Sequence, residues 1–70
     1  MNNIVKEFDD EFAFEYKMRV RTEEGDTIYY NIEADDYYGA REATREFFAS
    51  DYPNKTILNV VMVDRKSLWH

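Results

Sequence analysis

The chain has 70 residues, of which 44% are hydrophobic and 17% aromatic, and its 15 acids and 9 bases give a formal net charge of −6. This length allows one small domain, residues 1–70, whose thin core leaves little room for a deep catalytic cleft. The absence of cysteine excludes a disulfide framework and a thiolate metal site, and the single histidine, His70, argues against a histidine-based metal site or catalytic triad.

The first eleven residues show no clear period, and we expect a flexible N-terminal segment over 1–11. They contain no basic region followed by an apolar stretch, and no run in the chain approaches the roughly 20 apolar residues that span a membrane. We therefore expect a cytoplasmic protein without membrane contact. Four acids of this segment lack the spacing and the glycine of a calcium loop, so we expect no metal there: Glu7, Asp9, Asp10 and Glu11.

The next two stretches have the period-two pattern of half-buried strands. Large apolar side chains alternate with small or charged ones from Phe12 to Arg21, and a second alternation runs from Thr27 to Ala34. Between them, Glu23-Glu24-Gly25-Asp26 supplies a polar turn with a glycine for positive φ. The sequence therefore predicts a β-hairpin whose apolar face carries Phe12, Phe14, Tyr16, Met18 and Val20 on the first strand and Ile28, Tyr30, Ile32 and Ala34 on the second.

After Asp35 and Asp36, either of which can cap a helix, the period becomes helical. The helix is expected to end near Ser50-Asp51, because Pro53 restricts the residue before it to extended geometry. Gly39 lies in the first turn, and because glycine costs roughly 1 kcal/mol relative to alanine in a helix, we expect that turn to be weak or bent. The side expected to face the sheet carries Ala40, Ala43, Thr44 and Phe47, with Tyr37 and Phe48 at its edge.

Residues 56–64 are rich in β-branched side chains and predict a third strand that is apolar on both faces. A strand of this kind is usually covered on both faces or exposes one of them to a partner. Residues 65–70 are expected to form a tail in which Leu68 and Trp69 fold back on the sheet.

The expected fold is α+β, with two layers in the order β-β-α-β. A right-handed crossover after the hairpin places the third strand beside the first, which predicts a three-stranded antiparallel sheet in the order 2-1-3 with one helix packed on one face. The alternative is a third strand parallel to the second at the other edge of the sheet. The expected core consists of Phe14, Tyr16, Met18, Ile28, Ile32, Ala43, Phe47, Leu58 and Val60.

The acids are candidates for binding rather than for catalysis. In the predicted fold they lie on solvent faces or turns, and the sequence has no glycine-rich phosphate loop, so we expect no enzyme, no catalytic residue and no cofactor. The first forty residues hold eleven acids and four bases, a net charge of −7 that would steer the protein toward a basic site of the kind that holds nucleic acid. The alternative is a solvated acidic face that only keeps the protein soluble.

Tyrosine is the second candidate feature, because it is enriched at the energetic centres of protein interfaces. The tyrosines exceed what the core of a small domain needs; the alternative is that each lies half-buried over that core. Together with the acids of the hairpin and of the helix start, they define the expected partner-binding residues: Glu23, Glu24, Asp26, Tyr29, Glu33, Asp35, Asp36, Tyr37 and Tyr38.

Lys17, Arg19 and Arg21 form a basic stripe on the outer face of the first strand, with Tyr29 near them on the second. Basic and aromatic side chains together on a sheet can bind single-stranded nucleic acid. The alternative is cross-strand pairing with Glu33 and other acids of that face. Because the chain is acidic overall, we expect no direct contact with nucleic acid.

The pattern from the end of the hairpin to the last strand resembles a known group of proteins. It runs from Ala34-Asp35-Asp36 through Ala40, Ala43 and Phe47 to Tyr52-Pro53, and continues in Ile57-Leu58-Asn59-Val60-Val61. Over residues 12–64 the chain looks like the small β-β-α-β proteins that bacteriophages encode to disable host machinery, a group that includes a short inhibitor of bacterial RNA polymerase and several anti-CRISPR proteins. The resemblance implies a non-enzymatic inhibitor that binds a host protein or ribonucleoprotein complex in the host cytoplasm. The alternative is an accessory or structural subunit that acts as a homodimer, joined through strand edges or the sheet face.

Overall fold

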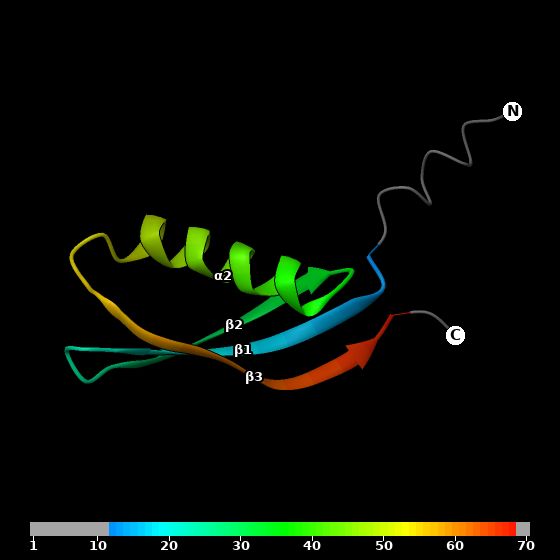
Figure 1. Cartoon of the computed structure of the whole chain (residues 1–70), viewed down its shortest axis with the longest axis horizontal. Helices are drawn as coiled ribbons and strands as arrows, with labels where there is room; N and C mark the ends of the chain where they lie inside the picture. Colours follow the sequence, from blue (N-terminus) through cyan, green and yellow to red (C-terminus); the bar gives the residue numbers. More distant parts are fainter. Residues whose placement is uncertain (1–11, 69–70) are drawn as a thin grey trace, which may run out of the picture.

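The computed structural model of this protein describes residues 12–68, which form three strands and one helix (Figure 1). In chain order these are β1 (Phe14–Thr22), β2 (Thr27–Ala34), α2 (Tyr37–Asp51) and β3 (Ile57–Ser67). The strands form one sheet in the order β2-β1-β3, and β1 pairs antiparallel with both of its neighbours. The predicted α+β fold and strand order are confirmed, and the alternative with a parallel third strand is wrong.

The hairpin forms as its alternating pattern predicts. Its register runs from Phe14 opposite Ala34 to Arg21 opposite Thr27. Gly25 makes the turn with a φ of 97°, a left-handed conformation that other residues rarely adopt. The inward-facing side chains of β1 are buried because the helix crosses this face of the sheet; they are Tyr16, Met18, Val20 and Thr22.

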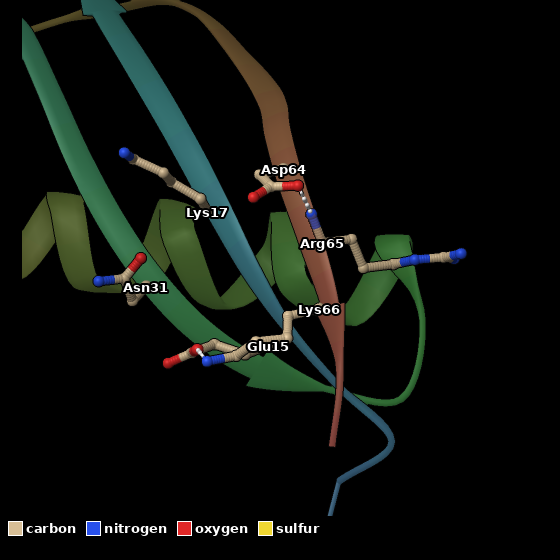
Figure 2. A pocket seen from close by; sticks show the side chains of 6 residues that line it. All are labelled: Glu15, Lys17, Asn31, Asp64, Arg65 and Lys66. Carbon is tan, nitrogen blue, oxygen red and sulfur yellow. Dashed lines mark hydrogen bonds and ion pairs between the residues drawn. The ribbon is translucent and has the colours of Figure 1, made fainter. Parts of the chain in front are cut away.

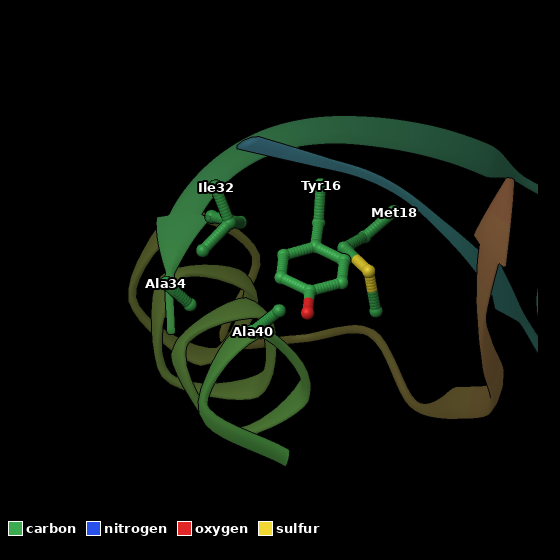
Figure 3. Close-up of a cluster of buried hydrophobic side chains, with 5 residues drawn as sticks. All are labelled: Tyr16, Met18, Ile32, Ala34 and Ala40. Atoms are coloured by element: carbon green, nitrogen blue, oxygen red, sulfur yellow. The ribbon is translucent and has the colours of Figure 1, made fainter. Parts of the chain in front are cut away.

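The core lies between the helix and the two strands of the hairpin. Its central cluster consists of Tyr16, Met18, Ile32, Ala34 and Ala40 (Figure 3). The fully buried Ala40 lets the helix approach the sheet closely, because its side chain is only a methyl group. Of the expected core residues, three are buried, namely Tyr16, Met18 and Ile32, and four are half-buried, namely Phe14, Ile28, Ala43 and Val60.

Helix α2 begins and ends where the sequence predicts. Asp36 is the N-cap, and its carboxylate Oδ1 accepts a hydrogen bond of 2.8 Å from the backbone N–H of Gly39. Gly39 therefore does not interrupt the first turn, and a Cβ at this position would lie 3.3 Å from the capping oxygen. At the other end, the N–H of Tyr52 donates to the carbonyl of Phe48 at 2.8 Å, and Pro53 follows outside the helix.

The sheet-facing side of α2 differs from the prediction at Phe47, which is 52% exposed, whereas the next residue, Phe48, is only 2% exposed. The buried helix residues are Ala40, Thr44 and Phe48, which are spaced by four. At about 100° per residue, Ala40 and Phe48 lie about 40° to either side of Thr44, which has no exposed surface and marks the centre of the buried face. Phe47 lies about 60° from Thr44, farther from that centre. Phe47 instead stacks on Tyr30 of β2, with 6.3 Å between the ring centroids.

Tyr30 gives this side of the helix a pH-dependent contact, because its hydroxyl donates a hydrogen bond of 2.8 Å to Asp51 Oδ2. Burial, and then the neighbouring carboxylate, raise the pKa of Tyr30 to about 12. The pKa of Tyr30 is therefore higher in the folded protein than the value of about 10 that it has in the unfolded chain. The neutral phenol stabilises the fold fully below pH 10, and this contribution is lost as the pH rises through the pKa of the folded protein. We expect the urea midpoint to fall over this range by more than it does in a Tyr30→Phe variant. Equal alkaline losses in the two proteins would contradict this role for Tyr30.

Strand β3 is longer and less regular than predicted. It extends to Ser67, so residues 65–67, which were expected in the tail, pair with β1. Its register with β1 shifts twice, and each shift leaves one β3 residue without an opposite residue on β1, first Leu58 and then Val63. Shifts of this form are β-bulges, which reverse the alternation of faces along the strand. Leu58, which was expected in the core, is 59% exposed for this reason.

The two described ends of the chain meet at one end of the sheet. The N–H of Leu68 donates to the carbonyl of Ala13 at 2.9 Å, and Leu68 is half-buried. The expected flexible segment over 1–11, with its four acids, and Trp69 lie outside the described residues. Within residues 12–68, no helix is long and apolar enough to cross a membrane.

Candidate protein-binding site

The structure divides the expected binding residues among three separate places. These are the β1–β2 turn with Glu23, Glu24 and Asp26, the outer face of the sheet with Tyr29 and Glu33, and the start of α2 with Asp35, Asp36, Tyr37 and Tyr38. The turn and the helix start lie at opposite ends of β2 (Figure 1), whose eight residues span roughly 25 Å at about 3.3 Å per residue. The acids therefore do not form one continuous surface.

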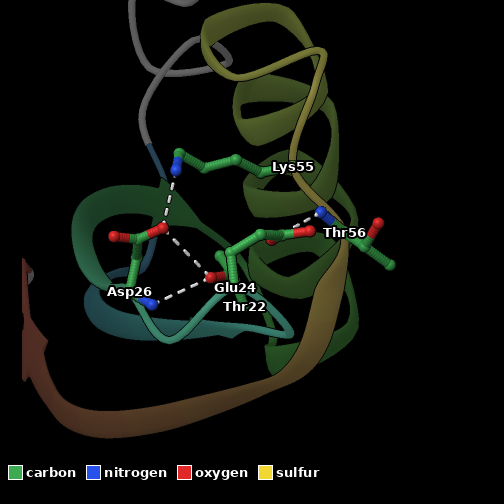
Figure 4. A network of polar contacts seen from close by, with 5 residues as sticks. All are labelled: Thr22, Glu24, Asp26, Lys55 and Thr56. Atoms are coloured by element: carbon green, nitrogen blue, oxygen red, sulfur yellow. Dashed lines mark hydrogen bonds and ion pairs between the residues drawn. The ribbon is translucent and has the colours of Figure 1, made fainter.

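The acids of the turn hold the start of β3 in place (Figure 4). Asp26 Oδ2 forms an ion pair of 2.7 Å with Lys55 Nζ. Glu24 Oε1 accepts the backbone N–H of Thr56 at 3.1 Å, and the N–H of Glu23 donates to the Thr56 carbonyl at 2.9 Å. These bonds fasten the acidic turn to the residue that precedes β3.

Asp26 is a structural residue of the turn rather than a free charge. The Lys55 ammonium group lowers the pKa of the Asp26 carboxyl, chiefly through their hydrogen bond, and Asp26 raises the pKa of Lys55 in the same way. The Thr22 hydroxyl accepts the N–H of Asp26 at 2.9 Å and donates to Asp26 Oδ2 at 3.3 Å. Because the pKa of Asp26 is lowered, its stabilising effect is present above its unfolded value and is lost as the pH falls through the folded one. Solvent screens this pair, so the effect is small.

The start of α2 gathers exposed aromatic side chains beside acids. This set is named the aromatic end and consists of Phe12, Asp35, Asp36, Tyr37 and Tyr38. Asp35 Oδ1 accepts the backbone N–H of Ala13 at 3.1 Å, which ties the residues before β1 to the loop after β2. Tyr38 is 70% exposed, and Tyr37 and Phe12 are also exposed. Phe12 was expected on the apolar face of the first strand, but it precedes β1 and is 43% exposed.

The outer face of the sheet carries the predicted basic stripe beside Tyr29. Lys17 Nζ lies 5.3 Å from the centre of the Tyr29 ring, and Arg19 is directly opposite Tyr29 in the register. The expected pairing with Glu33 is not formed, because Lys17, Arg19 and Arg21 make no ion pair within the described part of the chain. Acids on the same face nearly balance these bases, so the face offers no strong positive field; they are Glu15, Glu33 and Asp64.

A shallow pocket of about 140 Å³ lies on this outer face (Figure 2). Side chains of both charges line it, namely Glu15, Lys17, Asn31, Asp64, Arg65 and Lys66. Lys66 Nζ lies 3.2 Å from Glu15 Oε1, so these two charges offset each other. Among residues 12–68, no group of three or more histidine, cysteine, aspartate or glutamate side chains could hold a metal ion. The pocket thus presents neither a uniform positive site nor a cluster of acids.

An apolar surface on β3 completes the set of candidates. Helix α2 lies mainly over β1 and β2 (Figure 3), so β3 is little covered. Four of its apolar side chains are exposed, and this set is named the β3 strip: Leu58, Val61, Met62 and Val63. They lie on both faces of the strand, since Val61 is opposite the outward-facing Arg19 and Met62 is opposite the buried Met18. The sequence carried a signal for it, because a strand that is apolar on both faces predicts either burial or a partner. Because α2 does not cover β3, these side chains are exposed rather than buried.

The chain matches no protein-family model, no curated protein and no solved structure. Two regions of residues 12–68 expose apolar side chains from ordered backbone and are the candidates for binding a partner. The aromatic end holds tyrosines beside carboxylates, on a capped helix turn. The β3 strip lies on a strand at the edge of the sheet.

Proposed function

We propose that the chain is a small, acidic, non-enzymatic inhibitor or regulator that binds a host protein or ribonucleoprotein complex in the host cytoplasm and needs no cofactor. The aromatic end makes the contact, and its acids face a basic site of the partner that otherwise holds nucleic acid. The observation that carries this proposal is the exposure of Tyr37 and Tyr38 beside Asp35 and Asp36. The resemblance to small phage-encoded inhibitors supports the same function.

The tyrosines of the aromatic end are suited to act as anchors. Tyr38 leaves most of its ring in water, and covering that surface with a partner is favourable. Tyrosine has only two side-chain torsions, so ordering it on binding costs little entropy. The Asp36 cap holds the first turn of α2, so both rings are presented from a backbone that is already ordered.

The aspartates contribute attraction at longer range. Asp35 and Asp36 are exposed carboxylates at the same end of the molecule as the tyrosines. Charge of this kind mainly raises the rate of association with a basic partner. Asp26 of the β1–β2 turn is less suited to this role, because the ion pair with Lys55 already offsets its charge.

The test begins by identifying the partner with tagged protein in a bacterial host lysate and mass spectrometry, and continues with binding kinetics of the purified pair. Tyr38→Ala is expected to raise Kd at least tenfold, about 1.4 kcal/mol, mainly through faster dissociation. Tyr29→Ala removes another exposed tyrosine, on the outer sheet face, and is the matched control; its Kd should equal that of the wild type. If Tyr38→Ala binds like the wild type, the aromatic end is not the binding site and the proposal is wrong.

A second variant isolates the charges. Asp35→Asn/Asp36→Asn removes both charges but keeps oxygens that can accept the same backbone hydrogen bonds. Association should slow at low salt, dissociation should stay unchanged, and the difference should vanish when salt screens the field. If the double variant associates as fast as the wild type at low salt, the two aspartates do not attract a basic site of the partner, and that part of the proposal is wrong.

A further inference from the structure

Arg41 of helix α2 is a half-buried base without an ionic partner in the described part of the chain. Its Nε atom is buried and, among residues 12–68, has no hydrogen-bond acceptor. Unpaired buried donors are unfavourable and rare in native proteins. The helix supplies no acid either, because the positions three and four residues from Arg41 hold Tyr37, Tyr38, Thr44 and Arg45. A carboxylate from another part of the chain or from a partner would satisfy this arginine.

Arg41 lies on the side of α2 that is directed toward β3. At about 100° per residue, Arg41 and Phe47 lie about 60° to opposite sides of Thr44. Phe47 stacks on Tyr30 of β2, and β3 is at the other edge of the sheet, so Arg41 is on the β3 side. Arg45 lies on the same side, about 100° from Thr44. The two arginines are named the arginine flank, and at a spacing of four residues their like charges repel each other.

The part of β3 on the same face of the sheet is apolar and only partly covered. Met62 lies opposite the buried Met18 and is 40% exposed, and Val60 is half-buried. Arg65 follows on this face, with its guanidinium carbon 4.3 Å from the centre of the Phe14 ring. This side of the helix therefore joins basic and apolar side chains, which fits an acidic segment that also carries apolar residues.

The first eleven residues of the chain have this complementary composition. They contain one base and four acids, a formal charge of 1 − 4 = −3, and the acids are Glu7, Asp9, Asp10 and Glu11. Three large apolar side chains accompany them, namely Ile4, Val5 and Phe8. The segment can thus supply carboxylates to the arginine flank and apolar cover to Met62.

This segment is attached close to the arginine flank. Asp35, in the loop before α2, accepts the N–H of Ala13, and the Ala13 carbonyl accepts the N–H of Leu68 just after β3. Ala13 therefore lies between the start of α2 and the end of β3 (Figure 1), and Arg41 is in the second turn of that helix. Asp9 is four residues before Ala13, so its Cα can lie as far as about 14 Å from that of Ala13. The acids are within reach of the arginine flank.

We propose that residues 1–11 fold back along the β3 side of α2, where their carboxylates pair with Arg41 and Arg45 and their apolar side chains cover Met62. The chain's own segment is favoured over a second molecule, because the tether keeps it at a high effective concentration and little translational freedom is lost on contact. The sequence predicts a flexible segment here, whereas the proposed contact orders it. The inference goes beyond the proposed function, because the contact forms within the protein before any partner binds.

A spin label on the segment tests the contact. The chain has no cysteine, so Asn3→Cys provides a single attachment site in the full-length protein. The methyl NMR signal of Met62 should lose most of its intensity when the label is paramagnetic. Val61 is the matched control, because it is the neighbouring residue on the opposite face of the sheet, and its methyl signals should stay stronger. Equal losses at Met62 and Val61 would overturn the proposal. Loss of the Met62 signal in a mixture of spin-labelled and separate isotope-labelled molecules would assign the site to a second copy and also overturn it.

A charge exchange in the spin-labelled protein tests the pairing itself. Asp9→Lys/Asp10→Lys and Arg41→Glu/Arg45→Glu should each restore the Met62 signal, and the four substitutions together should remove it again because opposite charges then meet once more. Arg19→Glu/Arg21→Glu changes two arginines on the outer sheet face and is the matched control, which should behave like the unsubstituted protein. Circular dichroism establishes that each variant is folded. A combined variant that keeps its Met62 signal would overturn the proposal. These readouts use the protein without a partner, so they fail or succeed independently of the partner affinity that Tyr38→Ala tests.

Discussion

Replacing Phe48 by alanine is expected to lower the free energy of unfolding by about 3–5 kcal/mol. Phe48 is 2% exposed, and its ring centroid lies 5.3 Å from that of Tyr52, so the substitution removes buried apolar surface and leaves a cavity. Small domains have a total stability near the low end of about 5–15 kcal/mol. The variant should therefore lose most of its stability, which thermal unfolding followed by circular dichroism would measure.

The adjacent phenylalanine is the matched control. Phe47 is 52% exposed and contacts Tyr30 by ring stacking, so Phe47→Ala should cost only about 1 kcal/mol. In a domain of this size that corresponds to a fall in Tm of roughly 4–8 °C. Equal losses in the two variants would mean that α2 is rotated relative to the sheet from the position described here.

Enlarging Ala40 to leucine is expected to cost about 1–3 kcal/mol by overpacking. Ala40 has no exposed surface and lies in the core cluster with Tyr16, Met18 and Ile32, so a larger side chain must push the helix away from the sheet. Ala49→Leu is the control, because Ala49 is exposed on the same helix. Urea unfolding should show a lower midpoint for Ala40→Leu alone. A stable Ala40→Leu protein would show that the helix does not approach the sheet this closely.

Several acids that the sequence marks as binding candidates have structural partners. Asp36 caps α2, Asp35 holds the backbone of Ala13, and Asp26 pairs with Lys55. Reversing these charges would weaken the fold and confuse a binding experiment. The asparagine variants proposed above avoid this because they remove charge and keep an accepting oxygen.

The hairpin, the helix bounds and the strand order could be predicted because their causes are local or topological. The alternation around Gly25 determines the hairpin, Asp36 and Pro53 bound the helix, and the handedness of crossovers places β3 beside β1. The tyrosines and acids of the helix start were also recognisable from the sequence. The exposure of Phe12 could not be predicted, because the first position of an alternating run does not reveal where strand pairing begins.

The sequence by itself determined the order of elements, the antiparallel hairpin and the acidic character of the chain, since each depends on residue types and their spacing. Only the tertiary structure decided which of two adjacent phenylalanines is buried, because neighbouring helix residues differ by about 100° in direction and the packing of Thr44 at the centre of the buried face sets the rotation. It also decided that β3 stays uncovered. The single helix has 15 residues and covers mainly β1 and β2. The two bulges turn Leu58 and Val63 of β3 away from the core. Apolar side chains that a second helix would bury therefore remain exposed on the edge strand.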